Sequence, residues 1–528
     1  HPAEIILLRE RCVMHLQAAA VFSDAMVLQR GRDIPVWGRG REGSRVSVSF
    51  AGIRVDAGVA GGQWQVLLPP LEAGVRGVLD ISDGETVLRF QNVVAGDVWL
   101  AGGQSNMELA LPNCRNGAEE LAACNNPDIR FYQAVKLAVV DEQLLRAEAR
   151  NGWRVCRPDT AAGLSAVAWF FARKLYAETG VPIGIIGCNW GGSSVSAWMS
   201  EEWLAKSLAG QKYLDDYAAL VGDKTDEQYD QELRDYFHSW NAWDRRVRAR
   251  RAREPGLSWE ILNRDCGECP WPQPAGRKSP FRPGNLYHAM ICRLAPFALK
   301  GFLYYQGEED ANRAYAASYA ELMRYLIDQW RTDWGDDSLP FLFVQLPMYG
   351  SRAEMDAGLS LPDWPILREN QFRVAQTVAN TGMAVIIDRG EFDNIHPLDK
   401  QTVGLRLAYQ ALKRVYGLPL EADGPIYTRL VREGPRLRVL FAHTAGGLVW
   451  QGEQALSEGQ ETGFELAGSN GLYHPAQARI EGGGVLLSSP AVPAPERARY
   501  AWTKWGPAPL YARNGLPAMP FRSHRGDC

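Results

Sequence analysis

The sequence predicts an α/β domain, a parallel sheet with helices on both faces, flanked by two β modules. Three observations predict it. Residues 21–96 carry short alternating apolar runs broken by Gly and Pro, residues 97–417 alternate apolar strands with helical stretches, and residues 418–528 return to short strands. Alternation at every second residue is typical of antiparallel strands, whereas strands separated by helices indicate a parallel sheet. A chain of 528 residues is also too long for one core.

The first β module follows an N-terminal extension, residues 1–20. Charged residues bound the apolar patch of this extension closely, so it does not resemble a secretory signal. Inside the module, two stretches place apolar side chains on one face of a strand: Val46, Val48 and Phe50, and then Trp64, Val66 and Leu68. The connection at 92–97 is short and mostly apolar, unlike a solvated linker. We therefore expect the module to pack rigidly against the next domain.

The middle domain contains the alternating elements in order. We expect strands at 98–101, 183–187, 301–305, 341–346 and 383–388, and helices at 167–178, 316–330 and 402–415. Residues 205–280 form an insertion, in which an acidic stretch near 226–235 and a basic stretch at 245–253 predict a solvated helix rather than a binding site. In open parallel sheets ligands bind at the carboxyl ends of the strands, so the site is expected there.

The last part of the chain, residues 418–528, is expected to form the second β module. Leu437, Val439 and Phe441 alternate as in a half-buried strand. The end of the chain is rich in Trp and Pro, including Trp502 and Trp505. Such residues suit a docked terminus. We consider two positions for this segment, one near the carboxyl edge of the central sheet and one far from it.

Composition excludes several classes of protein. The formal net charge is −4, without the basic excess of a nucleic-acid-binding protein, and no run of 18 apolar residues suggests a membrane span. The nine cysteines cannot all pair, which favours a reducing, cytoplasmic compartment. Cys266 and Cys269 lack the partners of a zinc site. We expect no metal and no cofactor, and the sequence does not predict an oligomeric state.

Four polar segments follow predicted strands of the middle domain. Ser105 lies in a Gly-Gly-Gln-Ser turn, where its hydroxyl is exposed and backbone amides favour negative charge. Gly192 lies in a Gly-Gly-Ser-Ser turn whose amides can face an oxyanion, and Gln306 offers an amide donor. His396 follows Asp393 by three residues, so the carboxylate can reach the Nδ1 atom of the imidazole.

Each of these segments alone is more typical of a structural role: a turn serine, a helix cap, a polar loop or a satisfied histidine. Together they supply a nucleophile, oxyanion donors, a base and an orienting acid at one edge of one domain. Asp388, at the end of a predicted strand, is a second candidate for the orienting acid.

These segments resemble the sequence blocks of sialate O-acetylesterase-like proteins, a family of SGNH hydrolases. The blocks are Gly103-Gln104-Ser105-Asn106-Met107, Gly191-Gly192-Ser193, Tyr305-Gln306-Gly307-Glu308 and Ile395-His396-Pro397, and the similarity extends from about Val21 to Arg522. The resemblance implies a flavodoxin-like sheet with Ser105 as nucleophile and His396 as base. It also implies the amides of Ser105 and Gly192, with the Gln306 side chain, as oxyanion donors.

The sequence departs from the family at two positions. Relatives usually read Asn-Asp-Ile-His-Pro, whereas here Asp393 precedes Asn394, and Glu309 and Asp310 stand where relatives tend to have a small residue and Asn. The first departure bears on the orienting acid, and the second adds negative charge near the site.

The resemblance implies a serine esterase, a carboxylic ester hydrolase that removes O-acetyl groups from a carbohydrate such as O-acetylated sialic acid. Acetylated xylan or mannan oligosaccharides are alternative substrates, and a non-catalytic carbohydrate-binding protein is the alternative class. We expect a small-molecule or oligosaccharide substrate and no nucleic-acid or membrane partner. Within the blocks, Gln104, Asn106 and Glu308 are candidate substrate-binding residues, and so is Trp190, which directly precedes Gly191.

Overall fold

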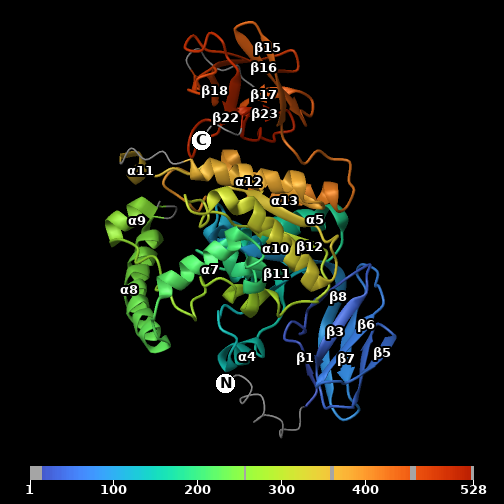
Figure 1. The fold of residues 1–528 in the computed structure, drawn as a ribbon. Helices are drawn as coiled ribbons and strands as arrows, with labels where there is room; N and C mark the ends of the chain where they lie inside the picture. The colour runs from blue at the N-terminus through green and yellow to red at the C-terminus, as the bar shows by residue number, and fades with distance from the viewer. Residues whose placement is uncertain (1–14, 255–256, 258, 357–361, 452–459, 525–528) are drawn as a thin grey trace.

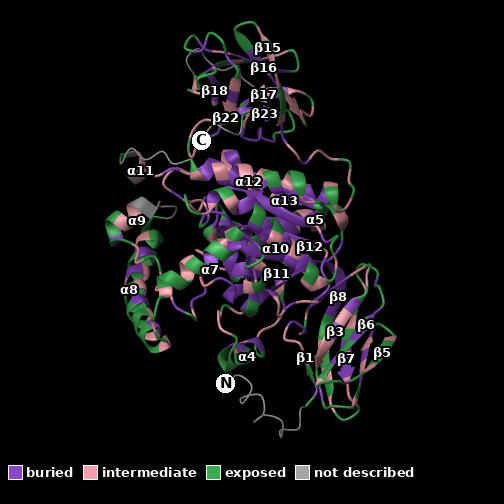
Figure 2. Ribbon diagram, in the orientation of Figure 1, coloured by how far each residue is buried: buried purple, intermediate pink, exposed green. Residues whose placement is uncertain are grey.

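The computed structural model describes residues 15–254, 257, 259–356, 362–451 and 460–524. Figure 1 shows three parts: the N-terminal β module at the lower right, an α/β domain in the centre and the C-terminal β module at the top. This arrangement confirms the predicted fold class. In Figure 2 the buried residues concentrate in the central strands and in the helix faces turned toward them.

The central sheet has the strand order β10-β9-β11-β8-β12-β13-β14. All neighbours in this order pair in parallel except β10, which lies antiparallel to β9 at the edge. The strands are β8 (Val87–Gly103), β9 (Asn126–Gln133), β10 (Arg154–Cys156), β11 (Ile183–Asn189), β12 (Gly301–Tyr305), β13 (Phe341–Gln345) and β14 (Thr381–Val385). The last of these starts and ends earlier than the strand expected at 383–388.

Helices cover both faces of this sheet. Trp99 of β8 packs on Phe171 of α5 (Ala166–Thr179), with ring centroids 5.1 Å apart. Two neighbouring side chains of β12, Phe302 and Tyr304, instead pack on Trp330 of α10 (Tyr319–Trp334). Gly301 is in register with Trp99, so Phe302 and Tyr304 point to the face opposite that of Trp99. Helices α5 and α10 therefore lie on opposite faces of the sheet.

The remaining elements of the domain connect the strands. Gly404 of α13 (Lys400–Arg414) packs closely against Phe170 of α5, and α12 (Asp363–Thr377) contacts α10. The shorter helices are α2 (Ser105–Glu108), η1 (Leu111–Asn113), α3 (Gly117–Ala123), α4 (Glu142–Glu148), η2 (Ala161–Gly163), η3 (Val195–Trp198), η4 (Tyr287–Ile291), η5 (Ala316–Ser318), α11 (Arg352–Asp356) and η6 (Ile387–Arg389).

The insertion is helical, as predicted. It contains α6 (Glu201–Leu204), α7 (Leu208–Val221), α8 (Asp226–Arg253) and α9 (Trp259–Cys266). A capping box at Thr225 and acidic residues begin α8, and arginines end it, so its charges complement the helix dipole. Tyr229, Tyr236 and Trp243 recur every seven residues and form its buried stripe. In Figure 1 α8 lies along the side of the central domain.

The N-terminal module shares a strand with the central domain. Strand β8 has 17 residues; its first half pairs with β7 and β2, and its second half lies between β11 and β12. The boundary expected at residue 96 therefore falls inside one strand. The other strands are β1 (Gln17–Ala18), β2 (Val27–Gln29), β3 (Ile34–Arg39), β4 (Arg45–Phe50), β5 (Ile53–Gly58), β6 (Gln63–Leu68) and β7 (Arg76–Ser82).

A buried carboxylate fixes this junction. Asp97 accepts hydrogen bonds from the Arg30 guanidinium at 3.0 Å, from Gln29 at 3.1 Å and from the Tyr416 hydroxyl at 2.9 Å. Its partners come from the β2 segment and from the residues after α13. The carboxylate thus ties the N-terminal module to the central domain.

The C-terminal module consists of three small antiparallel sheets, ordered β15-β16-β21-β20, β17-β23 and β19-β18-β22-β24 within the described residues. The strands are β15 (Ile426–Glu433), β16 (Arg436–Ala442), β17 (Leu448–Trp450), β18 (Phe464–Ala467), β19 (His474–Pro475), β20 (Gln477–Glu481), β21 (Gly484–Ser488), β22 (Arg497–Tyr500), β23 (Leu510–Ala512) and β24 (Phe521–Arg522).

The segment between β22 and β23 contacts the loops of the central domain. The Lys504 carbonyl accepts from the Tyr349 amide at 3.0 Å, and its ammonium pairs with Glu354 at 2.5 Å. Trp505 packs on Phe392 with ring centroids 5.5 Å apart. Because Phe392 lies four residues before His396, this segment lies beside the loop of the candidate base. Of the two positions considered for it, the structure shows the one near the carboxyl edge of the sheet.

Candidate active site

The nucleophile and base predicted from the sequence lie in hydrogen-bond contact. Ser105 begins α2 directly after β8, and His396 lies in the loop between η6 and α13. The His396 Nε2 atom is 2.9 Å from the Ser105 Oγ atom. This is the distance that proton transfer from a serine to an imidazole base requires.

The turn before Ser105 is held by its two neighbouring strands. The Gln104 amide donates to the Tyr305 carbonyl, and the Trp190 amide donates to the Gly103 carbonyl, each at 3.0 Å. Gly103 has φ +133°, and a Cβ atom there would lie 2.1 Å from the Tyr305 carbonyl oxygen. Only glycine permits this close approach. The sharp turn therefore presents the Ser105 hydroxyl at the carboxyl edge of the sheet.

The imidazole is neutral over the physiological pH range. Its removal from water, together with the nearby cations Lys400 and Arg251, lowers the pKa of His396 to about 3. A neutral imidazole can accept the Ser105 proton, whereas an imidazolium cannot. Arg251 comes from the end of α8, so the insertion contributes charge to the site.

The structure does not place either candidate acid on the imidazole. Asp393 has φ +57°, and this turn directs its carboxylate to the Arg352 amide at 2.5 Å, while its own amide donates to Gly350. Within the described part of the chain, no hydrogen bond joins Asp393 to His396. The prediction that Asp393 lies within about 3 Å of the imidazole is therefore wrong for this structure. Its carboxylate holds the 350–352 loop against the loop of the base.

Asp388 is also engaged elsewhere. The Arg406 guanidinium donates to both of its carboxylate oxygens, at 2.5 Å and 2.9 Å, and the Tyr511 hydroxyl donates at 3.2 Å. Asp388 thus links α13 to the C-terminal module. On the loop itself, the Asn394 side chain accepts from the His396 amide at 3.1 Å, which holds the backbone of the base.

Two backbone amides near Ser105 are available to a ligand. The amides of Ser105 and Gly192 donate to no group of the chain as far as it is described, whereas the Gly191 amide donates to Glu108 at 2.6 Å. A Cβ atom on Gly191 would lie 3.3 Å from the Ser105 Cβ atom, so the glycine loop lies against the nucleophile. This arrangement suits two amide donors toward an oxyanion.

The Gln306 side chain does not lie free as an oxyanion donor. Its amide nitrogen contacts Asp310 at 2.5 Å and the Gln104 side chain and Ser193 carbonyl at 3.2 Å each, and its oxygen accepts from Tyr319. It is 1 % exposed. The expectation of a third donor is therefore not met here, because Asp310 draws the amide inward. Gln306 instead joins the ends of β8, β11 and β12.

Three of the four candidate substrate-binding residues are internal. Asn106 donates to Glu308 at 2.5 Å and to the Ile395 carbonyl at 2.9 Å, and it accepts from Lys400 at 2.5 Å. This buried network joins the serine turn to the histidine loop. Gln104 is likewise buried, and its side chain accepts from the amides of the β12 loop.

Sequence reasoning missed Lys400, whose buried ammonium compensates the Glu308 carboxylate. Burial lowers the pKa of Lys400 to about 8, and Glu308 opposes this effect. A lysine at the first position of a helix gave no signal of its function.

Trp190, the fourth candidate substrate-binding residue, is half-buried in the glycine loop, with the Lys136 ammonium 5.0 Å from its ring centroid.

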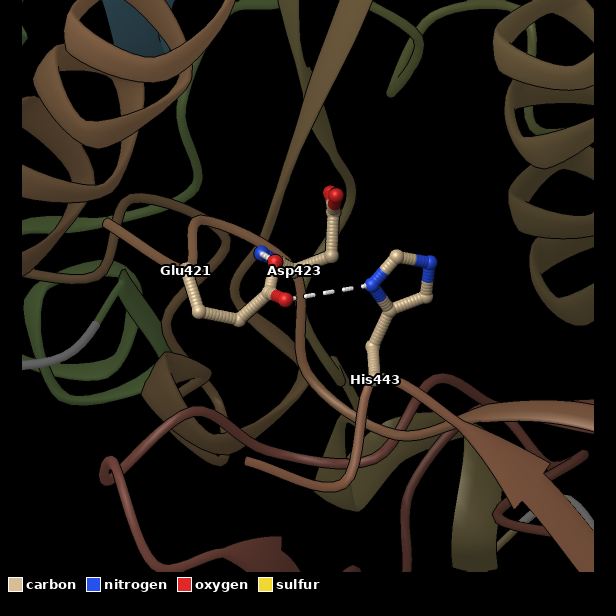
Figure 3. A group of neighbouring side chains, drawn as sticks. All are labelled: Glu421, Asp423 and His443. Atoms are coloured by element: carbon tan, nitrogen blue, oxygen red, sulfur yellow. Dashed lines mark hydrogen bonds and ion pairs between the residues drawn. The ribbon is translucent and has the colours of Figure 1, made fainter. Parts of the chain in front are cut away.

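One cluster among the described residues has side chains of metal-binding type: Glu421, Asp423 and His443 (Figure 3). The Glu421 carboxylate and the His443 Nδ1 atom are 3.4 Å apart. Lys413 pairs with Glu421, and Arg414 pairs with Asp423 at 2.7 Å. These cations already balance both carboxylates, so the cluster acts as an ion-pair network between α13 and the C-terminal module.

Comparisons with known proteins agree with this site. Residues 274–412 match the family described as carbohydrate esterase, sialic acid-specific acetylesterase. A carbohydrate acetylesterase from Xanthomonas citri has a similar structure, with a TM-score of 0.75 and 32 % identity over 96 % of this chain and 99 % of that one. The sialate O-acetylesterase of Mus musculus is 28 % identical over 96 % of this chain and 95 % of its own length; that of Homo sapiens is 26 % identical over 95 % and 91 %.

The fold and the serine–histidine pair define a carboxylic ester hydrolase. More particularly, the chain belongs to the carbohydrate acetylesterase family of the Xanthomonas citri enzyme, with which it aligns over nearly its full length. No helix in the described residues has the length and apolar character needed to cross a membrane.

Proposed function

We propose that this chain is a serine esterase that removes O-acetyl groups from O-acetylated sialic acid. The contact of 2.9 Å between Ser105 and His396 carries the proposal, because it supplies an activated nucleophile at the position where the fold binds ligands. The curated relatives are sialate O-acetylesterases, and the matching family is described as specific for sialic acid, which supports this substrate.

The reaction proceeds by two acyl transfers. His396 Nε2 accepts the Ser105 proton as Oγ forms a bond to the acetyl carbonyl carbon. The intermediate collapses, and the sugar oxygen leaves with the proton from His396, which leaves an acetyl group on Ser105. Water then loses a proton to His396 and attacks this ester, and Ser105 regains the proton as acetate departs.

Backbone amides stabilise the intermediates in this scheme. The Ser105 and Gly192 amides donate to the carbonyl oxygen as it becomes negative, and each such donor contributes about 3 kcal/mol in the transition state. Gln306 acts indirectly, because its contact with the Ser193 carbonyl holds the glycine loop in place. The imidazole needs no prior deprotonation at neutral pH, since the pKa of His396 is low.

The experiment compares the purified protein with its Ser105→Ala and His396→Ala variants on O-acetylated sialic acid, with acetate release as the readout. In both variants kcat is expected to fall at least about a thousandfold, because the nucleophile and its base act together and each variant removes one of them. Acetylated xylo- and manno-oligosaccharides serve as comparison substrates. A Ser105→Ala protein that retained near-normal turnover would refute the nucleophile, and higher kcat/KM on the neutral oligosaccharides would refute the substrate.

The seven cysteines of the described residues are thiols. Within this proposal they support a cytoplasmic location, which cell fractionation would test.

A further inference from the structure

The loop after α9 brings a tryptophan to the glycine loop of the site. A Cβ atom on Gly192 would lie 2.3 Å from the Cη2 atom and 2.5 Å from the Cζ2 atom of Trp271. The edge of the indole therefore lies directly on the Gly192 backbone. On the other side of the same loop, Gly191 lies against Ser105. Two glycines thus separate the nucleophile from the indole ring.

Trp271 is held in place but remains accessible. Its ring meets Phe281 edge to face, with centroids 5.3 Å apart, and its amide donates to the Cys269 carbonyl at 2.8 Å. Even so, the residue is 43 % exposed. Among the described tryptophans, only Trp505 is similarly exposed, at 40 %. An aromatic ring fixed at one edge and open elsewhere is suited to contact a ligand.

The segment that carries Trp271 is anchored to the central domain. Farther along it, the Gly284 amide donates to the Ser196 carbonyl at 3.0 Å. From the insertion, the Tyr213 hydroxyl donates to Asp310, which also accepts from the Val195 amide after the glycine loop at 2.9 Å. These contacts fix the insertion relative to Gly192. The position of the indole is therefore set by the same groups that set the oxyanion loop.

We propose that Trp271 is a specificity-determining residue, an aromatic platform on which the pyranose ring of the acetylated sugar stacks while the acetyl carbonyl faces Ser105 and Gly192. The axial C–H face of a pyranose is apolar, and stacking on the indole buries that face and the ring together. The contact is made equally in the ground state and the transition state, so it lowers KM and leaves kcat nearly unchanged. This proposal rests on the proposed esterase function.

The test compares two esters, O-acetylated sialic acid and ethyl acetate, which has no ring to stack. Trp271→Ala is expected to raise KM for the sugar ester about tenfold, with kcat and the ethyl acetate rate within twofold of wild type. Trp271→Phe keeps an aromatic face and is expected to recover most of the loss. Phe237→Ala, which removes an equally exposed aromatic side chain of α8 in the same insertion, is the matched control and is expected to behave as wild type.

Binding provides a second readout without turnover. In a Ser105→Ala background, Trp271→Ala is expected to raise the Kd for intact O-acetylated sialic acid by a similar factor, measured by calorimetry. If Trp271→Ala lost equal activity on both esters, the proposal would be refuted, because the indole would then only support the Gly192 loop. Unchanged kinetics on both esters would also refute it. If wild type cleaved neither ester, the esterase proposal itself would fail, and the wild-type measurement reveals this separately.

Discussion

A methyl group at Gly192 tests how the oxyanion loop works. Gly192 has φ +74°, where a residue with a side chain is strained by about 1 kcal/mol. The added Cβ atom would lie 2.3 Å from the Trp271 ring, whereas carbon atoms pack at about 3.5 Å. The loop or the ring must therefore move by roughly 1 Å. A donor displaced by that amount loses its contact with the oxyanion, which costs about 3 kcal/mol, or about a hundredfold in rate.

The assay measures kcat/KM of Gly192→Ala on ethyl acetate, so that sugar binding does not contribute. Gly180→Ala is the matched control, because Gly180 has φ +65° but open space around its Cβ position. It is expected to lose stability without losing activity. The double variant Gly192→Ala/Trp271→Ala is expected to regain part of the rate, since the ring no longer blocks the methyl group. Activity of Gly192→Ala within threefold of wild type would refute the reasoning.

Three further predictions follow from the geometry. Because the pKa of His396 is lowered, its base form persists as the pH falls, and the acid limb of kcat/KM is expected below the ordinary histidine value of 6.5; a limb at or above that pH contradicts it. Asp97→Ala should lower the free energy of unfolding by about 3 kcal/mol in urea titrations. Asp80→Ala, which removes one carboxylate from a solvent-exposed ion pair, should lower it by less than about 1 kcal/mol. Limited proteolysis should cleave slowly at Ala95 and Pro419, and rapid release of stable fragments would show loosely tethered modules.

The sequence predicted the elements that carry strong local signals. Apolar runs bounded by Gly or Pro located β11, β12 and β13, and the polar blocks after β8 and β14 located Ser105 and His396. Strand β9 was not predicted from the sequence, because it begins Asn-Pro-Asp and contains Arg130. The buried guanidinium of Arg130 donates to the carbonyls of residues 25 and 92. A charged residue buried by distant backbone groups does not appear as an apolar pattern.

The predictions about the site that were wrong concern side chains whose direction depends on contacts between distant segments. Spacing alone suggested that Asp393 reaches His396, but its left-handed backbone and the Arg352 amide set its direction. Gln306 has the residue type of a donor, yet the buried Asp310 carboxylate turns it inward. Trp271 lies in an insertion whose role no local pattern indicated. Side-chain direction is decided by packing and by long-range partners, which a single sequence does not reveal.

The continuous strand β8 has a consequence for how activity and folding are linked. One end of this strand is an ordinary member of a β module, and the other end delivers Ser105. Loss of the module would remove the hydrogen bonds of β2 and β7 to the first half of β8, which fix where the strand enters the central sheet. The N-terminal module thus helps to position the nucleophile. Thermal inactivation of the enzyme should therefore coincide with thermal unfolding of this module.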